Sequence, residues 1–141
     1  MKSGTKALTL LLVAYAAASL LHYAHNAEFL AEYPNMPAWL SRTKVYCAWL
    51  ALSALGSAGY LLFLRGYRLA GLLTLGAYAA AGLDSLSHFA LAPPAAHTAV
   101  MNATIWLDAG TAALLLVAVA ILLAKRPRRA YWVIRKSRPP K

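Results

Sequence analysis

Four long apolar stretches, separated by short polar connections, constrain the fold of this chain more than any other feature. They cover residues 7–33, 45–64, 69–91 and 98–124. Each is close to the roughly 20 apolar residues that an α-helix needs to cross a bilayer. Of the 141 residues, 61% are hydrophobic and only 13% are charged, against about 25% charged in soluble domains. The sequence therefore predicts an all-α integral membrane protein, a four-helix antiparallel bundle in up-down order that forms one domain.

The basic residues predict how this bundle is oriented. Twelve of the 14 lysines and arginines lie before the first stretch, between the second and third, or in the tail that follows the fourth. Only Arg42 and Lys44 lie on the opposite side. By the positive-inside rule, this asymmetry places both termini in the cytoplasm, and the chain is expected in a cell membrane, the bacterial inner membrane.

The tail, residues 125–141, combines eight basic residues with the aromatic pair Tyr131 and Trp132. Such a segment is expected to lie along anionic lipid headgroups. Topology and lipid contact thereby explain the net charge of +10, and the basic residues lack the folded polar surface on which nucleic-acid binding depends. Membrane lipids are therefore the predicted partners and a second membrane protein is a further candidate, whereas nucleic acid is not expected to bind.

The residues able to carry chemistry gather at one depth of the predicted bundle. All four acidic residues and all four histidines fall in or beside the halves of the stretches that lie farther from the cytoplasm. At a rise of 1.5 Å per residue, His22, Asp84 and Asp108 each lie about 24 to 26 Å from a cytoplasmic basic residue. In a hydrocarbon layer about 30 Å thick, three different helices then present a polar group just below the outer boundary.

Helical phase predicts that these groups face the bundle interior. His22 and His25 are three residues apart on one face of the first helix, and Asp84 and His88, four residues apart, are predicted to stack on consecutive turns. The fourth stretch carries a polar stripe that includes Asp108. Polar stripes inside a membrane turn inward because lipid offers them no hydrogen-bond partner.

This mixture of imidazole nitrogens and carboxylate oxygens suits a transition metal ion, here copper, zinc or iron. The predicted site opens to the outer, periplasmic side and serves metal handling or a metal-dependent reaction on a membrane-dissolved substrate. Its predicted ligands are His22, His25, Asp84, His88 and Asp108. Further candidate ligands are His97, Glu28 and Met101.

Other functions fit the same residues. A heme b held between imidazoles of the first and third stretches would make the chain an electron-transfer subunit. The chain could also be a non-catalytic accessory subunit of a larger membrane complex, or a metal-free lipid-modifying or isomerising enzyme. A hydrogen-bonded Asp–His lock between helices would explain the buried acids without any ligand. Glu28 is alternatively expected to reach water and pair with Arg42 or Lys44.

The orientation leads to a direct test by cysteine labelling, with the single native Cys47 replaced by serine. A cysteine at Asn35 is expected to react with a membrane-impermeant maleimide in intact cells, because the connection after the first stretch lies outside. A cysteine at Ser137 is expected to react only after the membrane is permeabilised. Labelling of the Ser137 position in intact cells would reverse the orientation and turn the predicted site toward the cytoplasm.

Overall fold

The computed structural model describes residues 2–125, and this part of the chain is helical apart from short connections, without any strand. It contains 4 helices long and apolar enough to cross a membrane, which confirms the predicted number of long apolar helices. The tail from residue 126 onward, predicted to lie on lipid headgroups, is outside the described residues. The α-helices are α1 (Lys2–Glu28), α2 (Arg42–Leu64), α3 (Arg68–Gly82), α4 (His88–Leu91) and α5 (Ala99–Ala124).

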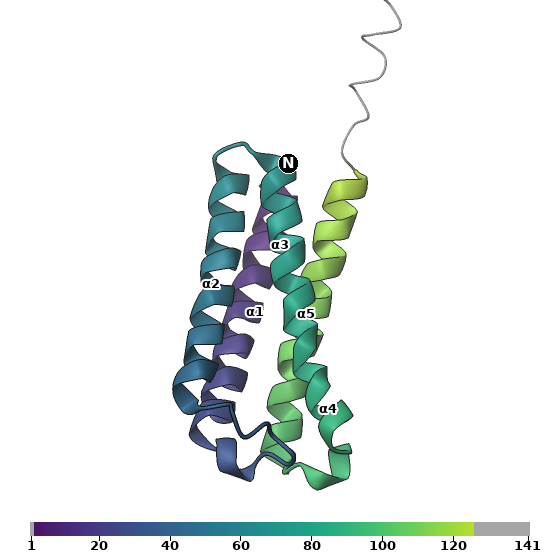
Figure 1. Ribbon diagram of the computed structural model, residues 1–141. Coiled ribbons are helices and arrows are strands. Elements are labelled where there is room, and N and C mark those ends of the chain that lie inside the picture. Colours follow the sequence, from purple (N-terminus) through teal and green to yellow (C-terminus); the bar gives the residue numbers. More distant parts are fainter. Residues whose placement is uncertain (1, 126–141) are drawn as a thin grey trace, which may run out of the picture.

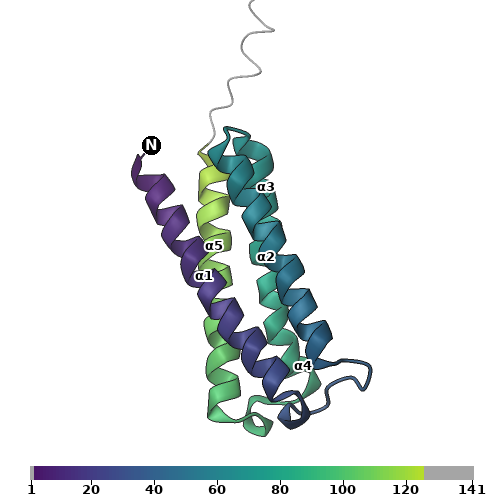
Figure 2. The ribbon, with the colours of Figure 1, turned by 90° about the vertical axis from the view of Figure 1, so that its left-hand side faces the viewer.

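The long helices run antiparallel and form a closed ring of neighbours. α1 packs against α2 and α5, and α3 packs against the same two helices from the other side. The beginning of α1 and the end of α5 lie at one end of the bundle (Figure 1). The 29–41 connection and α4 lie at the opposite end (Figure 2), which we call the loop end. The main core holds Leu8, Tyr15, Leu72, Leu75, Leu115 and Val119.

Glycines allow α2 and α3 to form a close hairpin. Gly66, in the turn between them, has a φ of 92°, a left-handed conformation that glycine adopts without steric cost. A Cβ atom on Gly71 would lie 2.5 Å from the backbone nitrogen of Phe63 and 2.8 Å from the carbonyl oxygen of Gly59. The two helix backbones therefore approach as closely as small residues permit in apolar bundles.

The first connection starts earlier than the sequence predicts. α1 ends at Glu28 rather than at residue 33, and a 3-10 turn, η1 (Leu30–Glu32), follows. Tyr33 is extended, with φ −72° and ψ 127°, as expected of a residue that precedes proline. α2 begins at Arg42 because the Ser41 hydroxyl accepts a hydrogen bond from the Lys44 backbone nitrogen, a typical N-cap contact.

The third apolar stretch is one candidate span from Arg68 to Leu91, as predicted, but its second half is not regular α-helix. α3 stops at Gly82, and a 3-10 segment, η2 (Leu83–Ser87), connects it to α4. A side chain at Gly82 would overlap the Tyr15 hydroxyl, so glycine at this position lets α1 approach α3. A 3-10 helix has 3.0 residues per turn instead of 3.6, which changes the direction of every side chain that follows.

The α2–α3 contact predicts unequal effects of two alanine substitutions on the same helix. Gly71→Ala should lower the free energy of unfolding by about 1 to 3 kcal/mol, because the new methyl group meets backbone atoms that cannot move aside. Gly76→Ala should be nearly neutral, since its Cβ atom would lie 3.5 Å from the Val119 side chain, an ordinary contact distance. Unfolding in detergent micelles titrated with sodium dodecyl sulfate measures both values, and similar losses in the two variants would contradict the assignment.

Candidate functional site

Two imidazoles from different segments meet inside the loop end of the bundle. His22 and Asn26 lie on consecutive turns of α1, and His88 is the first residue of α4. The rings of His22 and His88 are in edge-to-face contact, with centroids 5.4 Å apart. Asn26 Nδ2 lies 3.0 Å from His88 Nε2. All three side chains are buried, so α1 and α4 share a polar contact within an otherwise apolar bundle.

Tyr33 joins the remaining histidines to this pair. It lies in the 29–41 connection, which folds back so that the phenol is buried among Met101 and Ile105. Its ring centroid lies 4.9 Å from that of His88, and its hydroxyl lies 2.9 Å from His25 Nδ1. Burial raises the pKa of the Tyr33 phenol above its ordinary value, so the hydroxyl keeps its proton and can donate a hydrogen bond.

His97 completes the cluster and is more buried than its position after two prolines suggests. It is 7% exposed, and its ring centroid lies 6.2 Å from that of His88. Nδ1 lies 3.1 Å from the Pro93 carbonyl oxygen, a contact that fixes the ring in the connection before α5. The structure therefore brings His22, His88 and His97 together through ring contacts, with Tyr33 linking them to His25.

Several nitrogen and oxygen atoms of the cluster are buried without a hydrogen-bond partner. Native interiors leave few such atoms, and each one calls for a water molecule, an ion or a ligand. The unpartnered atoms are His22 Nδ1, Asn26 Oδ1, His88 Nδ1 and His97 Nε2. The protein thus satisfies only part of the hydrogen-bonding capacity of the cluster. Nitrogen atoms of His22, His88 and His97 remain available to a ligand.

Asp84 does not stack on His88 as predicted. It lies in η2, where residues three apart share a face, so Asp84 aligns with Ser87 rather than with His88. Its side chain is exposed, and among residues 2–125 it forms no ion pair with an imidazole. It nevertheless lines the same pocket as His22 and His88.

Asp108 is 0% exposed, and neither carboxylate oxygen has a hydrogen-bond partner. The nearby Ser85 hydroxyl donates its hydrogen bond to the Gly82 carbonyl oxygen, 2.9 Å away, and not to this carboxyl group. Ser19 Oγ, on the facing α1, is also buried and unpartnered. No hydrogen bond joins Asp108 to a histidine in the part of the chain that the structure describes, so the predicted common site of both aspartates is not formed.

The remaining candidate ligands have other roles. Glu28 Oε1 lies 2.7 Å from Arg42 Nη2 and accepts a hydrogen bond of 2.7 Å from the Tyr46 hydroxyl, which confirms the predicted surface pairing. Met101 is buried beside Tyr33 in a small apolar cluster. His25 is engaged by Tyr33 and lines a separate surface hollow between α1 and α5.

A pocket of about 310 Å³ opens beside the histidine pair, between α1, α2, η2 and the 29–41 connection. We call it the loop-end pocket. His22 and His88 form its inner wall, and Lys44 and Asp84 contribute one charge of each sign. Within residues 2–125, no three histidine, cysteine, aspartate or glutamate side chains are placed to hold a metal ion together. The arrangement offers two adjacent imidazoles and a nearby carboxylate instead of a finished three-ligand site.

The comparisons with known proteins add no relationship to this description. The chain matches no protein-family model, no curated protein and no solved structure.

Tyr33 is the part of the site that the sequence pattern does not reveal, and its role can be tested. Tyr33→Phe should lower the free energy of unfolding by about 1 kcal/mol, because only the hydrogen bond to His25 is lost. Tyr33→Ala should cost about 3 to 5 kcal/mol, because the ring between His88 and Met101 disappears. Both values are measurable by detergent-based unfolding, and equal losses would show that the ring does not organise the cluster.

Proposed function

We propose that the chain is a multi-pass membrane protein that binds a transition metal ion between His22 and His88, for metal handling at the outer side of the membrane. Four helices of sufficient length and apolarity support the insertion. The distribution of basic residues supports cytoplasmic termini. In that orientation the loop end is the outer end, facing the periplasm of a bacterial inner membrane.

One observation carries the proposal: two neighbouring imidazoles each keep a buried nitrogen without a partner. Imidazole nitrogens bind zinc at about 2.0 to 2.1 Å, so two rings that hold one ion must lie close together. The observed separation is 5.4 Å. Copper and zinc both accept imidazole nitrogens, and iron is a further candidate.

Neighbouring groups support this assignment. Ligating histidines usually donate the N–H of their other nitrogen to an oxygen that orients the ring. Asn26 Nδ2 faces His88 Nε2, so the Asn26 amide must turn over and present its unpartnered Oδ1 before it can accept that N–H and leave His88 Nδ1 free for the metal. Asp84, on the wall of the same pocket, supplies a carboxylate that can approach as a third ligand. The carboxylate would offset part of the ion's charge, which an apolar surrounding disfavours.

The same contact argues against the heme alternative. A heme held by both histidines would need space between their rings, whereas His22 and His88 touch each other edge to face. A structural lock without a ligand remains the competing hypothesis. It uses the Asn26–His88 contact and leaves the free nitrogens without a role.

Metal content per protein separates the proposal from the lock. Purified protein incubated with copper or zinc should retain the ion after gel filtration, and His22→Gln and His88→Gln should lose it. Asp84→Asn should weaken binding by about 10- to 100-fold, as for groups that assist the main ligands. Binding should weaken in acid, because imidazoles must be neutral to coordinate a metal.

His25→Gln is the matched control, because this histidine is held by Tyr33 and does not line the loop-end pocket. It should keep the full metal content. A folded wild type that remains empty with copper, zinc and iron would refute the metal site, and loss of stability without any metal in His88→Gln would favour the lock.

A further inference from the structure

Polar side-chain contacts join α1 and α2 at both ends of their interface. Near the start of α1, the hydroxyl groups of Thr9 and Tyr60 lie 2.8 Å apart. Near its end, Glu28 pairs with Arg42 at 2.7 Å and accepts a hydrogen bond from Tyr46. These contacts fix the spacing of the two helices along their length.

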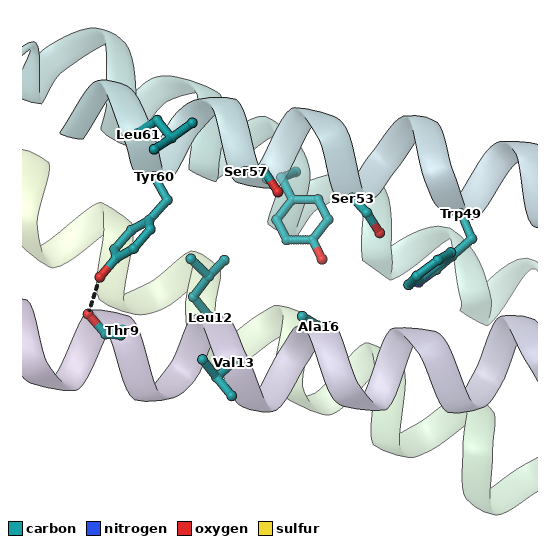
Figure 3. Close-up of a pocket in the computed structure, with 11 residues that line it drawn as sticks. Thr9, Leu12, Val13, Ala16, Trp49, Ser53, Ser57, Tyr60 and Leu61 are labelled. Atoms are coloured by element: carbon teal, nitrogen blue, oxygen red, sulfur yellow. Dashed lines mark hydrogen bonds between the residues drawn. The ribbon is translucent and has the colours of Figure 1, made fainter. Parts of the chain in front are cut away.

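The region between these two sets of contacts is hollow. A groove of about 510 Å³ lies there, within the roughly 300 to 1,000 Å³ of small-molecule sites. Figure 3 shows Trp49, Ser53 and Ser57 along α2, facing Leu12 and Ala16 of α1. Small side chains on the α2 wall leave this space open. From Trp49 to Leu61 the groove extends about 18 Å by helical rise, more than half of a hydrocarbon layer.

The loop-end pocket continues the same line. Its α1 wall begins at His22 and its α2 wall ends at Ala48, next to the Trp49 that borders the groove. The groove is lined mainly by apolar groups, whereas the pocket holds imidazoles and the opposite charges of Lys44 and Asp84. The two hollows follow each other along α2, although their α1 walls stop at Ala16 and resume at His22. We call the two together the track, which is apolar along most of its length and polar at one end.

We infer that this track binds a single-chain, uncharged amphiphile of the monoacylglycerol class, with its chain in the α1–α2 groove and its head in the loop-end pocket. The inference rests on the proposed function, because it requires the bundle to lie in a membrane and extends the same outer pocket. A hydrocarbon chain is the chemistry that a groove open to the bilayer interior accommodates without loss of hydrogen bonds.

Charge and hydrogen bonding select the head group. Lys44 and Asp84 give the pocket one charge of each sign, and Lys44 Nζ already donates a hydrogen bond of 2.8 Å to the Trp39 carbonyl oxygen. A head with a net charge of either sign would therefore face one like charge. A hydroxyl-bearing head can accept from the ammonium group and donate to the carboxylate. The ester carbonyl would lie where pocket and groove meet, beside Trp49. The indole nitrogen is covered and unpartnered, so turning the ring toward that carbonyl breaks no existing hydrogen bond.

Photolabelling can test this site on the purified full-length protein. The probe is a monoacylglycerol with a diazirine in its acyl chain, and mass spectrometry locates the label. Saturable labelling of residues 12–16 and 53–57 is expected, displaced by mono-olein but not by oleate. Ser53→Phe should reduce this labelling by about tenfold or more, because a phenyl ring blocks the groove. Ala54→Phe, at the adjacent exposed position, should leave it unchanged.

Unsaturable labelling, equal labelling of both phenylalanine variants, or equal displacement by oleate would each overturn the inference. Trp49→Phe should raise the mono-olein concentration needed to displace the probe by about 2- to 10-fold, which corresponds to the loss of one hydrogen bond. An unchanged concentration would show that Trp49 does not contact the ester carbonyl. Metal content measured on the same samples separates the two proposals, since Ser53→Phe leaves His22 and His88 intact. A variant that binds metal but no lipid probe affects the groove alone.

Discussion

The arrangement of the loop end depends on the change from α-helix to 3-10 helix at Leu83. Had the α-helix continued, Asp84 and His88 would share a face and Ser85 would point elsewhere. The tighter turn instead leaves Asp84 exposed on the pocket wall, buries Ser85 near Asp108, and still directs His88 toward His22. Gly82 makes room for Tyr15 immediately before this change. A 3-10 stretch within a long helix often marks a functional position. Here it directs Asp84 and His88 toward the loop-end pocket and Ser85 into the bundle interior.

Hydropathy and helical period were sufficient to predict the four long helices, because an apolar stretch of this length has few other solutions. The depth argument set His22, Asp84 and Asp108 at one level, whereas the structure brings His22 into ring contact with His88. The expected Asp84–His88 stack required an unbroken α-helix. The sequence of residues 83–87 contains no pattern that predicts the 3-10 turn found there. Tyr33 and His97 lie in connections whose path depends on tertiary packing, so their burial could not be predicted from local pattern.

The cluster combines stabilising contacts with unmet hydrogen-bonding capacity. Ring contacts and the Asn26–His88 pair tie the 29–41 connection and α4 to α1. Yet buried polar atoms without partners destabilise a fold, and an apolar side chain of similar shape would avoid this loss. If these side chains only held the helices together, leucine or phenylalanine at the same positions would give a more stable bundle. The unpartnered nitrogens of these imidazoles are therefore the reason why we propose a bound metal ion.

The contact between α1 and α5 has a consequence for how the chain reaches this structure during synthesis. The first and last long helices are neighbours in the bundle, so its ring can close only after the whole sequence has been made. The α2–α3 hairpin is local in sequence, whereas closure requires contacts between distant segments, which form slowly. His22 and Ser19, which are buried on α1 in the finished bundle, therefore stay partly uncovered until α5 packs against α1. During that interval the nascent protein exposes polar groups that a chaperone or a quality-control protease could recognise.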